Sequence, residues 1–289
     1  MITSVTQLID TIKEDLQNWN NKECKPWFRG ESGDQPALCP KINNYSYHQE
    51  NYLLQSFRRQ AGGLSNVPPQ EQADLWLLLA QHYGIPTRLL DWTEGALDAL
   101  YFAIIQDNSY PRVYMLNPQK LDELAGIRTY LPNYPQSWIE GCGLYVSLAW
   151  QNRKLDEASK DFQIRNKLDL EIPMAFPATY QDHRMIAQRS FFTIHGTLIE
   201  PIEDILRKKN ITVSDCLYKY EIANKARADL LKDLSLLGIS IATRFTDLDH
   251  LAQDLVSNVN TYSQNEISEG ISDIGSETSS EDETLRWIG

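Results

Sequence analysis

Three short stretches of this sequence combine charged side chains, aromatic rings and glycine in patterns that could bind an anionic or planar ligand. The first is KPWFRGES, at residues 25–32. Arg29 offers five donors in a rigid fork suited to phosphate or carboxylate, and the glycine after it lets a ligand or another segment approach the backbone closely. A structural arginine paired with a buried acid explains the same residues equally well. We predict an anion contact at Arg29, with further ligand contacts at Phe28, Gly30 and Ser32.

The second stretch, AQHYGIPTRLLDWT at residues 80–93, holds more polar side chains than a turn requires. It lies at the end of an expected helix, where loops often carry function. Helix-stop chemistry with a local Arg88–Asp91 ion pair would be the purely structural explanation. We favour a binding or catalytic site in which Asp91 accepts a hydrogen bond from Arg29 or Arg88 and holds a pocket in shape. Its candidate residues are His82, Tyr83, Thr87, Arg88, Asp91 and Trp92.

The third stretch, RMIAQRSFFTIHG at residues 184–196, predicts a strand with a polar start. Alternation along a strand places two sets of side chains on opposite faces: Ser190, Phe192 and Ile194 on one, and Phe191, Thr193 and His195 on the other. A lone strand histidine is more often a satisfied core residue than a ligand, so His195 stays outside the predicted site. Its candidates from this stretch are Gln188, Phe192 and Thr193.

Several common sites are missing from the sequence. It has no GxxxxGK[ST], HExxH or GxSxG motif, no GxGxxG after a strand, and no zinc-ligand spacing. P-loop nucleotide hydrolysis and zinc proteolysis are therefore poor explanations, and we expect no metal. A nuclease using His82 and Asp91 ranks last, because metal-dependent phosphodiester cleavage needs clustered carboxylates.

Charge and composition narrow the choice of partners. The 289-residue chain has a formal charge of −12, and residues 263–289 contribute seven acids against one base. Because the chain as a whole is acidic, non-specific binding to duplex nucleic acid is disfavoured, although the net charge does not exclude a local basic groove. Four widely spaced cysteines indicate free thiols. No apolar run is long enough to span a bilayer and the N-terminus does not resemble a signal peptide, so we expect a soluble, cytoplasmic protein with no membrane contact.

Helices and strands alternate along the chain and must position the three stretches. Apolar spacing predicts helices at 5–19, 48–60, 68–83, 93–104, 223–237 and 246–256, with residues 85–92 as a linker and Thr93 as a helix cap. Strands are predicted at 26–31, 113–116, 171–176, 190–199 and 217–220. We therefore expect a single α+β domain over residues 1–262, with a small mixed or antiparallel sheet surrounded by helices. The acidic, Ser-rich tail at 263–289 is predicted to be disordered.

Taken in order, these stretches resemble the FRG domain, a bacterial family named for its Phe/Tyr-Arg-Gly motif. Phe28-Arg29-Gly30 supplies that motif, and residues 80–93 are similar to the most distinctive block of the family. Residues 184–196 resemble its later block. LLGISIATRFTDLDHLAQDL, residues 236–255, resembles its closing segment, although Thr246 stands where a proline is more typical. The resemblance spans residues 27–255 and implies a component of bacterial conflict or phage-defence systems.

An aromatic-Arg-Gly strand near the N-terminus is also similar to the first motif of arginine-type ADP-ribosyltransferases, whose arginine holds a phosphate of NAD. The similarity implies that Arg29 contacts the pyrophosphate of NAD, that Tyr83 or Trp92 stacks on a ring, and that Gln188 with His82 or Asp91 serves the ribose. It also implies a Gln/Glu-x-Glu entrance to the later strand.

Here that entrance reads Gln188-Arg189-Ser190 and lacks the second glutamate; Glu200, ten residues later, is a weak substitute. Two hypotheses therefore remain. One is an ADP-ribosyltransferase or NAD glycohydrolase, acting on NAD with a protein or nucleic-acid target. The other is a non-catalytic module that senses a nucleotide, modified nucleic acid or phage component. The sequence does not indicate the oligomeric state.

Overall fold

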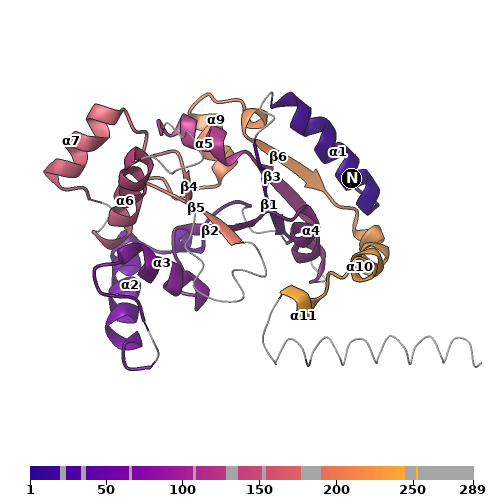
Figure 1. The fold of residues 1–289 in the computed structure, drawn as a ribbon, viewed down its shortest axis with the longest axis horizontal. Helices are drawn as coiled ribbons and strands as arrows, with labels where there is room; N and C mark the ends of the chain where they lie inside the picture. The colour runs from indigo at the N-terminus through magenta and orange to yellow at the C-terminus, as the bar shows by residue number, and fades with distance from the viewer. Residues whose placement is uncertain are drawn as a thin grey trace, which may run out of the picture.

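The computed structural model shows an α+β fold, as the sequence predicts. One six-stranded sheet has the strand order β4-β5-β2-β1-β3-β6, and all neighbouring strands are antiparallel (Figure 1). The described residues are 1–19, 24–33, 37–64, 67–106, 109–127, 136–151, 154–176, 190–244 and 252, without the side chains of 136–141. No helix in these ranges is both long enough and apolar enough to cross a membrane.

The strands are short, and their pairing is uneven along the sheet. They are β1 Trp27–Glu31, β2 Leu89–Thr93, β3 Arg112–Leu116, β4 Met174–Phe176, β5 Ser190–Ile194 and β6 Leu217–Glu221. β1 pairs with β3 along its whole length, and β2 does the same with β5. Between β1 and β2, however, the register contains the single pair Phe28↔Thr93. The sheet is therefore continuous on both sides of an opening at its centre.

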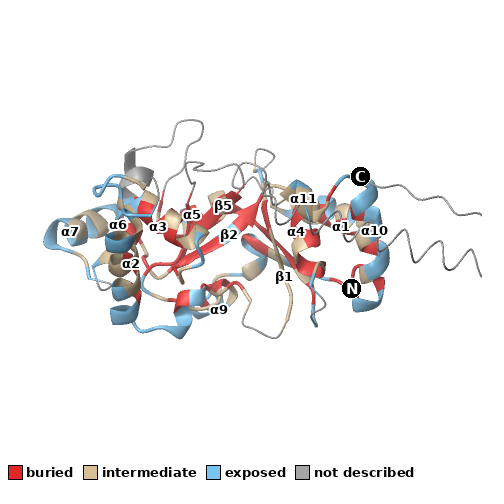
Figure 2. Ribbon diagram, turned by 90° about the horizontal axis from the view of Figure 1, so that it is seen from below, coloured by how far each residue is buried: buried red, intermediate tan, exposed pale blue. Residues whose placement is uncertain are grey.

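Most of the helices form two groups, one beside each half of this sheet. The described helices are α1 Val5–Asn18, α2 Tyr47–Ala61, α3 Ala73–His82, α4 Ala96–Ile104, α5 Pro118–Leu124, α6 Gln136–Trp150, α7 Glu157–Asn166, α9 Ile202–Lys208, α10 Arg227–Leu236 and α11 Ile241–Arg244. Figure 1 shows α2, α3, α6 and α7 beside β4-β5-β2, and α1, α4 and α10 beside β1-β3-β6. Each group closes its own hydrophobic cluster against the sheet. The strands between them are mostly buried, whereas α7 is largely exposed (Figure 2).

Capping residues explain where several of these helices begin and end. The Ser4 hydroxyl accepts a hydrogen bond from the amide of Gln7 at 3.1 Å, which starts α1. Ser46 and Gln49 form a reciprocal capping box at the start of α2. Gly84 follows α3 with a φ of +78°, a conformation that glycine adopts without strain.

The glycine of the Phe-Arg-Gly motif serves packing between a helix and a strand. A Cβ atom at Gly30 would lie 1.8 Å from the main-chain oxygen of Ala99 and 2.7 Å from the amide nitrogen of Ala103. Only glycine therefore lets α4 pack this closely on β1. Of the two reasons considered for this glycine, the approach of another segment is the one that the structure shows.

Some predicted boundaries were wrong. Residues 89–93 form β2 rather than a linker with a helix cap, and α4 begins only after Gly95, whose amide donates to the Thr93 hydroxyl. Four of the five β2 residues are buried, so the strand shows no apolar–polar alternation. α3 starts at Ala73 rather than at residue 68, and β5 ends at Ile194. The expected helix at 246–256 and the tail at 263–289 lie outside the described residues, apart from residue 252. All four cysteines are free thiols, as predicted.

Candidate functional site

Arg29 bridges the central opening of the sheet. Its Nη1 group donates a 2.7 Å hydrogen bond to the main-chain oxygen of Asp91, and so ties β1 to β2 beyond their single register pair. Its Nε group donates to Oε1 of Glu31 at 2.6 Å. The carboxylate of Glu31 also accepts from the amide of Leu38, at 3.2 and 3.3 Å from its two oxygens. The guanidinium is thus held by both strands and by the loop after β1.

The electrostatics keep Arg29 charged. Burial by itself would lower the pKa of its guanidinium, but the carboxylates of Glu31 and Asp91 raise that pKa above its ordinary value. Nη1 lies 3.8 Å from Oδ2 of Asp91, and the arginine side chain is 22% exposed. Within the described part of the chain, Nη2 makes no hydrogen bond. Its two N–H groups therefore remain available to an acceptor outside the protein.

The carboxylate of Asp91 is fixed by a second set of contacts. Nε2 of Gln81 donates to Oδ2 of Asp91 at 2.9 Å, and Oε1 of Gln81 accepts from the Thr87 hydroxyl at 2.5 Å. That hydroxyl in turn accepts from the amide of Leu89 at 3.1 Å. Sequence reasoning missed Gln81, although it lies in the block at 80–93 and is polar near the end of an otherwise apolar helix.

A cavity of about 560 Å³ occupies the opening between β1 and β2, and we call it the Arg29 cavity. It brings together seven predicted site residues: Phe28, Arg29, Gly30, His82, Asp91, Trp92 and Phe192. Among its other lining residues are Cys39, Lys41, Gln81 and Phe102. Burial, aided by nearby acids, raises the pKa of the Cys39 thiol to about 11, so this cysteine is not an activated nucleophile. The cavity thus combines one guanidinium, one lysine and one exposed carboxylate with aromatic side chains.

The structure does not bring every predicted residue into this cavity. Tyr83 is 62% exposed and packs edge-to-face on His82 with ring centroids 5.1 Å apart, so it lies next to the cavity lining. Thr193 is fully buried, and its hydroxyl accepts from the indole of Trp92 at 3.0 Å. Ser32 is half-buried and does not line the cavity. Gln188 lies outside the described residues.

Arg88 requires a correction, because it is an interior residue rather than a ligand contact. Its side chain is fully buried, and Nε and Nη2 each donate to a carboxylate oxygen of Glu50 at 2.8 Å. Nη1 donates to the main-chain oxygens of His195 and Gly196 at 3.1 and 2.8 Å. The carboxylate partner of Arg88 is therefore an acid from α2, and not the Asp91 of the purely structural explanation. Burial lowers the pKa of His195 itself to about 3, which keeps this core histidine neutral.

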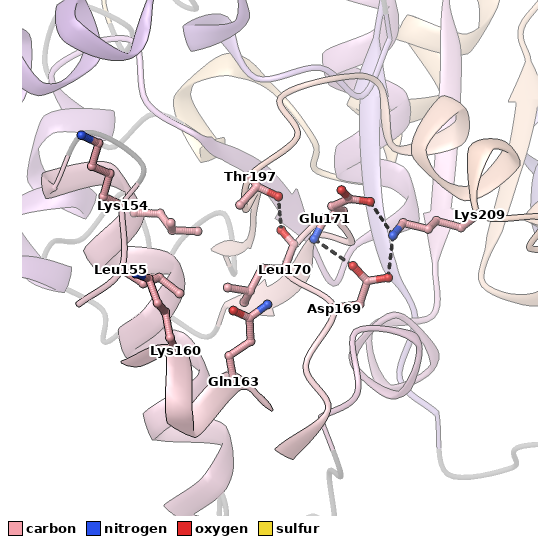
Figure 3. A pocket seen from close by; sticks show the side chains of 10 residues that line it. Lys154, Leu155, Lys160, Gln163, Asp169, Leu170, Glu171, Thr197 and Lys209 are labelled. Carbon is pink, nitrogen blue, oxygen red and sulfur yellow. Dashed lines mark hydrogen bonds and ion pairs between the residues drawn. The ribbon is translucent and has the colours of Figure 1, made fainter. Parts of the chain in front are cut away.

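A second cavity, of about 650 Å³, lies between α7 and the turn at residues 169–171, and we call it the Lys209 cavity (Figure 3). The ammonium group of Lys209 binds Asp169 at 2.8 Å and Glu171 at 2.5 Å. These two hydrogen bonds raise the pKa of the lysine. The remaining charged groups on its lining, those of Lys154 and Lys160, are exposed to solvent. Because its acids are already satisfied by a protein cation, we place the candidate site at the Arg29 cavity.

Neither cavity contains a recognisable metal centre. Across the described ranges, no group of three or more His, Cys, Asp or Glu side chains is arranged to hold a metal ion. Glu200, the weak substitute for a catalytic glutamate, lies beyond β5 and pairs with Lys208. It does not line the Arg29 cavity.

The family model of the FRG domain matches residues 25–111. The chain carries an FRG domain. This FRG segment contains β1, α2, α3, β2 and α4, and it supplies every residue of the cavity lining except Ser190 and Phe192. The other four strands of the sheet follow residue 111, so the sheet extends well beyond the matched segment. No curated protein and no solved structure matches the chain.

Proposed function

We propose that the Arg29 cavity of this FRG-domain protein binds a nucleotide, with NAD as the first ligand to test. What supports the proposal is one arrangement: cationic donors, an exposed carboxylate and aromatic rings share a cavity of about 560 Å³. That volume falls in the usual range for small-molecule sites, roughly 300–1,000 Å³. A nucleotide carries the matching groups, namely phosphate, sugar hydroxyls and a planar base.

The charges divide the cavity into a phosphate side and a sugar side. Nη2 of Arg29 offers two unused donors, and Lys41 is an exposed cation without an ion pair inside the described ranges. The acids beside Arg29 balance its charge, so Lys41 supplies the extra positive charge that a pyrophosphate requires. Asp91 repels phosphate and favours hydrogen-bond donors instead. The base would pack against aromatic side chains of the lining, such as Phe102 and Phe192.

Asp91 is also the group that we assign to catalysis if the bound nucleotide is NAD. A water molecule would attack the ribose C1′ atom while the C1′–N bond to nicotinamide breaks. Nicotinamide leaves as a neutral molecule with the bonding electron pair, the water oxygen joins C1′, and one proton is released. The Asp91 carboxylate would stabilise the positive charge that develops on the ribose, and His82 is the nearby candidate to accept the proton. An acceptor nucleophile in place of water gives ADP-ribosyl transfer.

The second candidate function is a non-catalytic nucleotide sensor. It is favoured by the contacts of Asp91, whose Oδ2 already accepts from Gln81 and lies 3.8 Å from Arg29. A carboxylate tied to the protein in this way suits recognition as well as catalysis. The missing glutamate at the start of the later strand points in the same direction.

Calorimetry on the purified full chain tests the proposal. Titrations with NAD, ATP and AMP should detect saturable binding of at least one nucleotide, and Arg29→Ala should weaken it by at least ~10-fold, the loss of a charged hydrogen bond. The matched control is Lys160→Ala in the Lys209 cavity, which removes an exposed cation and should leave affinity unchanged. Melting temperatures show whether each variant is folded. Absence of binding, or equal binding by the Arg29→Ala protein, would refute the nucleotide site.

Product analysis of the same mixtures separates the two candidate functions. Release of nicotinamide from NAD, abolished by Asp91→Asn, identifies an enzyme. Binding of NAD without consumption, retained over hours and with candidate protein or nucleic-acid acceptors added, identifies a sensor. The role in phage defence that the family resemblance implies stays a prediction. Plaque counts on bacteria expressing the wild type or Arg29→Ala would test it.

A further inference from the structure

We infer that Gln81 and Thr87 are positioning residues that make the Arg29 cavity select nucleotides with a free ribose hydroxyl. This inference rests on the proposed nucleotide function and deepens it, because it names which sugar the site accepts. Its starting point is the hydrogen-bond chain that runs from the amide of Leu89 through Thr87 and Gln81 to Asp91.

The direction of the first link is fixed by the backbone. An amide N–H can only donate, so the Thr87 hydroxyl accepts from Leu89 at 3.1 Å and uses its single proton elsewhere. That proton goes to Oε1 of Gln81 at 2.5 Å. Thr87 is 1% exposed, so water does not compete for either bond. The Thr87 hydroxyl therefore accepts from Leu89 through one oxygen lone pair and directs its single proton to the glutamine.

The amide of Gln81 connects the Thr87 hydroxyl to the carboxylate of Asp91. With Oε1 held by Thr87, the amide group of Gln81 must turn its Nε2 toward Asp91, where it donates to Oδ2 at 2.9 Å. A flipped amide would set its oxygen against the carboxylate and leave the Thr87 proton facing an N–H group. The Thr87 hydroxyl at one end and the Asp91 carboxylate at the other thus fix the orientation of the Gln81 amide between them.

The remaining oxygen of Asp91 is the one that a ligand meets. The aspartate side chain is 56% exposed and lines the cavity, and within the described residues its Oδ1 atom makes no hydrogen bond. Since Oδ1 can only accept, the ligand group opposite it must donate. Ribose hydroxyls are such donors, and carboxylate acceptors read them in dinucleotide-binding folds. A deoxyribose that lacks the hydroxyl recognised by Asp91 would leave Oδ1 without a hydrogen-bond donor.

The size of the preference follows from the bond that is lost. One hydrogen bond to a charged group corresponds to a preference of about 10- to 100-fold. We therefore expect the wild-type protein to bind ATP more tightly, by about that factor, than either 2′-dATP or 3′-dATP. Calorimetry with these three ligands identifies which hydroxyl is read.

Two variants of Thr87 separate positioning from simple structural support. Thr87→Val removes the hydroxyl at nearly constant volume, frees the Gln81 amide to rotate, and should reduce the ribose preference to less than about threefold. Thr87→Ser keeps the hydroxyl and should retain the full preference. Gln81→Leu should also lose the preference while the protein still binds the deoxynucleotide. The ratio of affinities is informative even where a variant is less stable.

The outcomes distinguish this inference from the function on which it rests. If wild type binds ATP and both deoxy forms equally well, the ribose preference is wrong but the nucleotide site stands. If Thr87→Val keeps the wild-type ratio, the positioning role is wrong. If none of these nucleotides nor NAD binds at all, the proposed function fails and this inference fails with it.

Discussion

Two arginines close to the centre of the sheet, Arg29 on β1 and Arg88 just before β2, end in opposite environments. Arg88 is fully buried and directs four hydrogen bonds to protein acceptors, two of them to Glu50. Arg29 is 22% exposed and makes two, which leaves Nη2 unbonded within the described part of the chain. The difference shows that two arginines from motif blocks can serve different ends: Arg88 stabilises the interior, whereas Arg29 keeps donors that a ligand could use.

The origin of each carboxylate partner explains the contrast. Glu50 comes from α2, thirty-eight residues before Arg88, and both side chains are buried. Glu31 lies two residues after Arg29 on the same strand, so no helix has to cover the guanidinium to bring the two charges together. Arg88 therefore ties α2 to the end of β5. Arg29 instead ties β1 to β2 beside a cavity.

The largest expected effect is on stability at the buried pair. Arg88→Met leaves the Glu50 carboxylate buried without its cation, and should lower the free energy of unfolding by about 3–5 kcal/mol. Arg29→Met should cost about 1–2 kcal/mol, because its partners can reach water. Urea unfolding followed by circular dichroism measures both.

A double variant provides the control for this comparison. Arg88→Met with Glu50→Met removes both buried charges and should recover a substantial part of the loss. Equal losses for Arg88→Met and Arg29→Met would contradict the structural distinction between the two arginines.

The buried histidine beside Arg88 should make the stability of the protein depend on pH. The pKa of His195 is about 3 in the folded protein because of burial, against about 6.5 when unfolded. The unfolded chain therefore binds a proton between pH 6.5 and pH 3 that the folded chain does not. The contribution of His195 to the free energy of unfolding is therefore fully present above pH 6.5. It falls, at up to about 1.4 kcal/mol per pH unit, as the pH drops from 6.5 toward 3.

His195→Gln isolates this contribution from the carboxylates that also titrate in acid. The variant should be less stable than wild type at pH 7.5, and its unfolding free energy should decline less steeply between pH 6.5 and pH 4.5. Parallel pH curves for the two proteins would show that the buried imidazole does not control this dependence.

These contrasts also show how far the sequence could lead. Local patterns predicted the α+β class, the strand that carries Arg29, and half of the described helices, namely α1 to α4 and α10, because caps and apolar spacing are encoded within a few residues. β2 was missed since a strand buried on both faces carries no alternation. The partner of Arg88 was missed for another reason: a pair formed across thirty-eight residues leaves no local signal.

For the candidate site, too, local motifs indicate which residues to consider, whereas tertiary contacts decide what those residues do. Phe28, Arg29, His82, Asp91 and Trp92, which the motif blocks singled out, line one cavity in the structure. The motif blocks could not reveal the role of Thr87, which depends on the tertiary contact of its hydroxyl with Gln81. They also could not show that Gly30 serves the packing of α4, because that requires the position of Ala99.

The smallest expected effect bears most directly on the function of Arg29. Glu31→Gln removes one negative charge beside the guanidinium while the amide can still accept from Nε, so stability should change by less than about 1 kcal/mol. Loss of that charge should increase affinity for an anionic nucleotide by about two- to ten-fold, since Arg29 is no longer balanced by two acids. The matched change, Glu50→Gln, should destabilise the protein and leave affinity per folded molecule unaltered. Calorimetry at low ionic strength distinguishes the two, because screening by salt weakens the first effect. If Glu31→Gln leaves affinity unchanged, the free donors of Arg29 do not face the ligand, and the distinction drawn between the two arginines would concern only their burial.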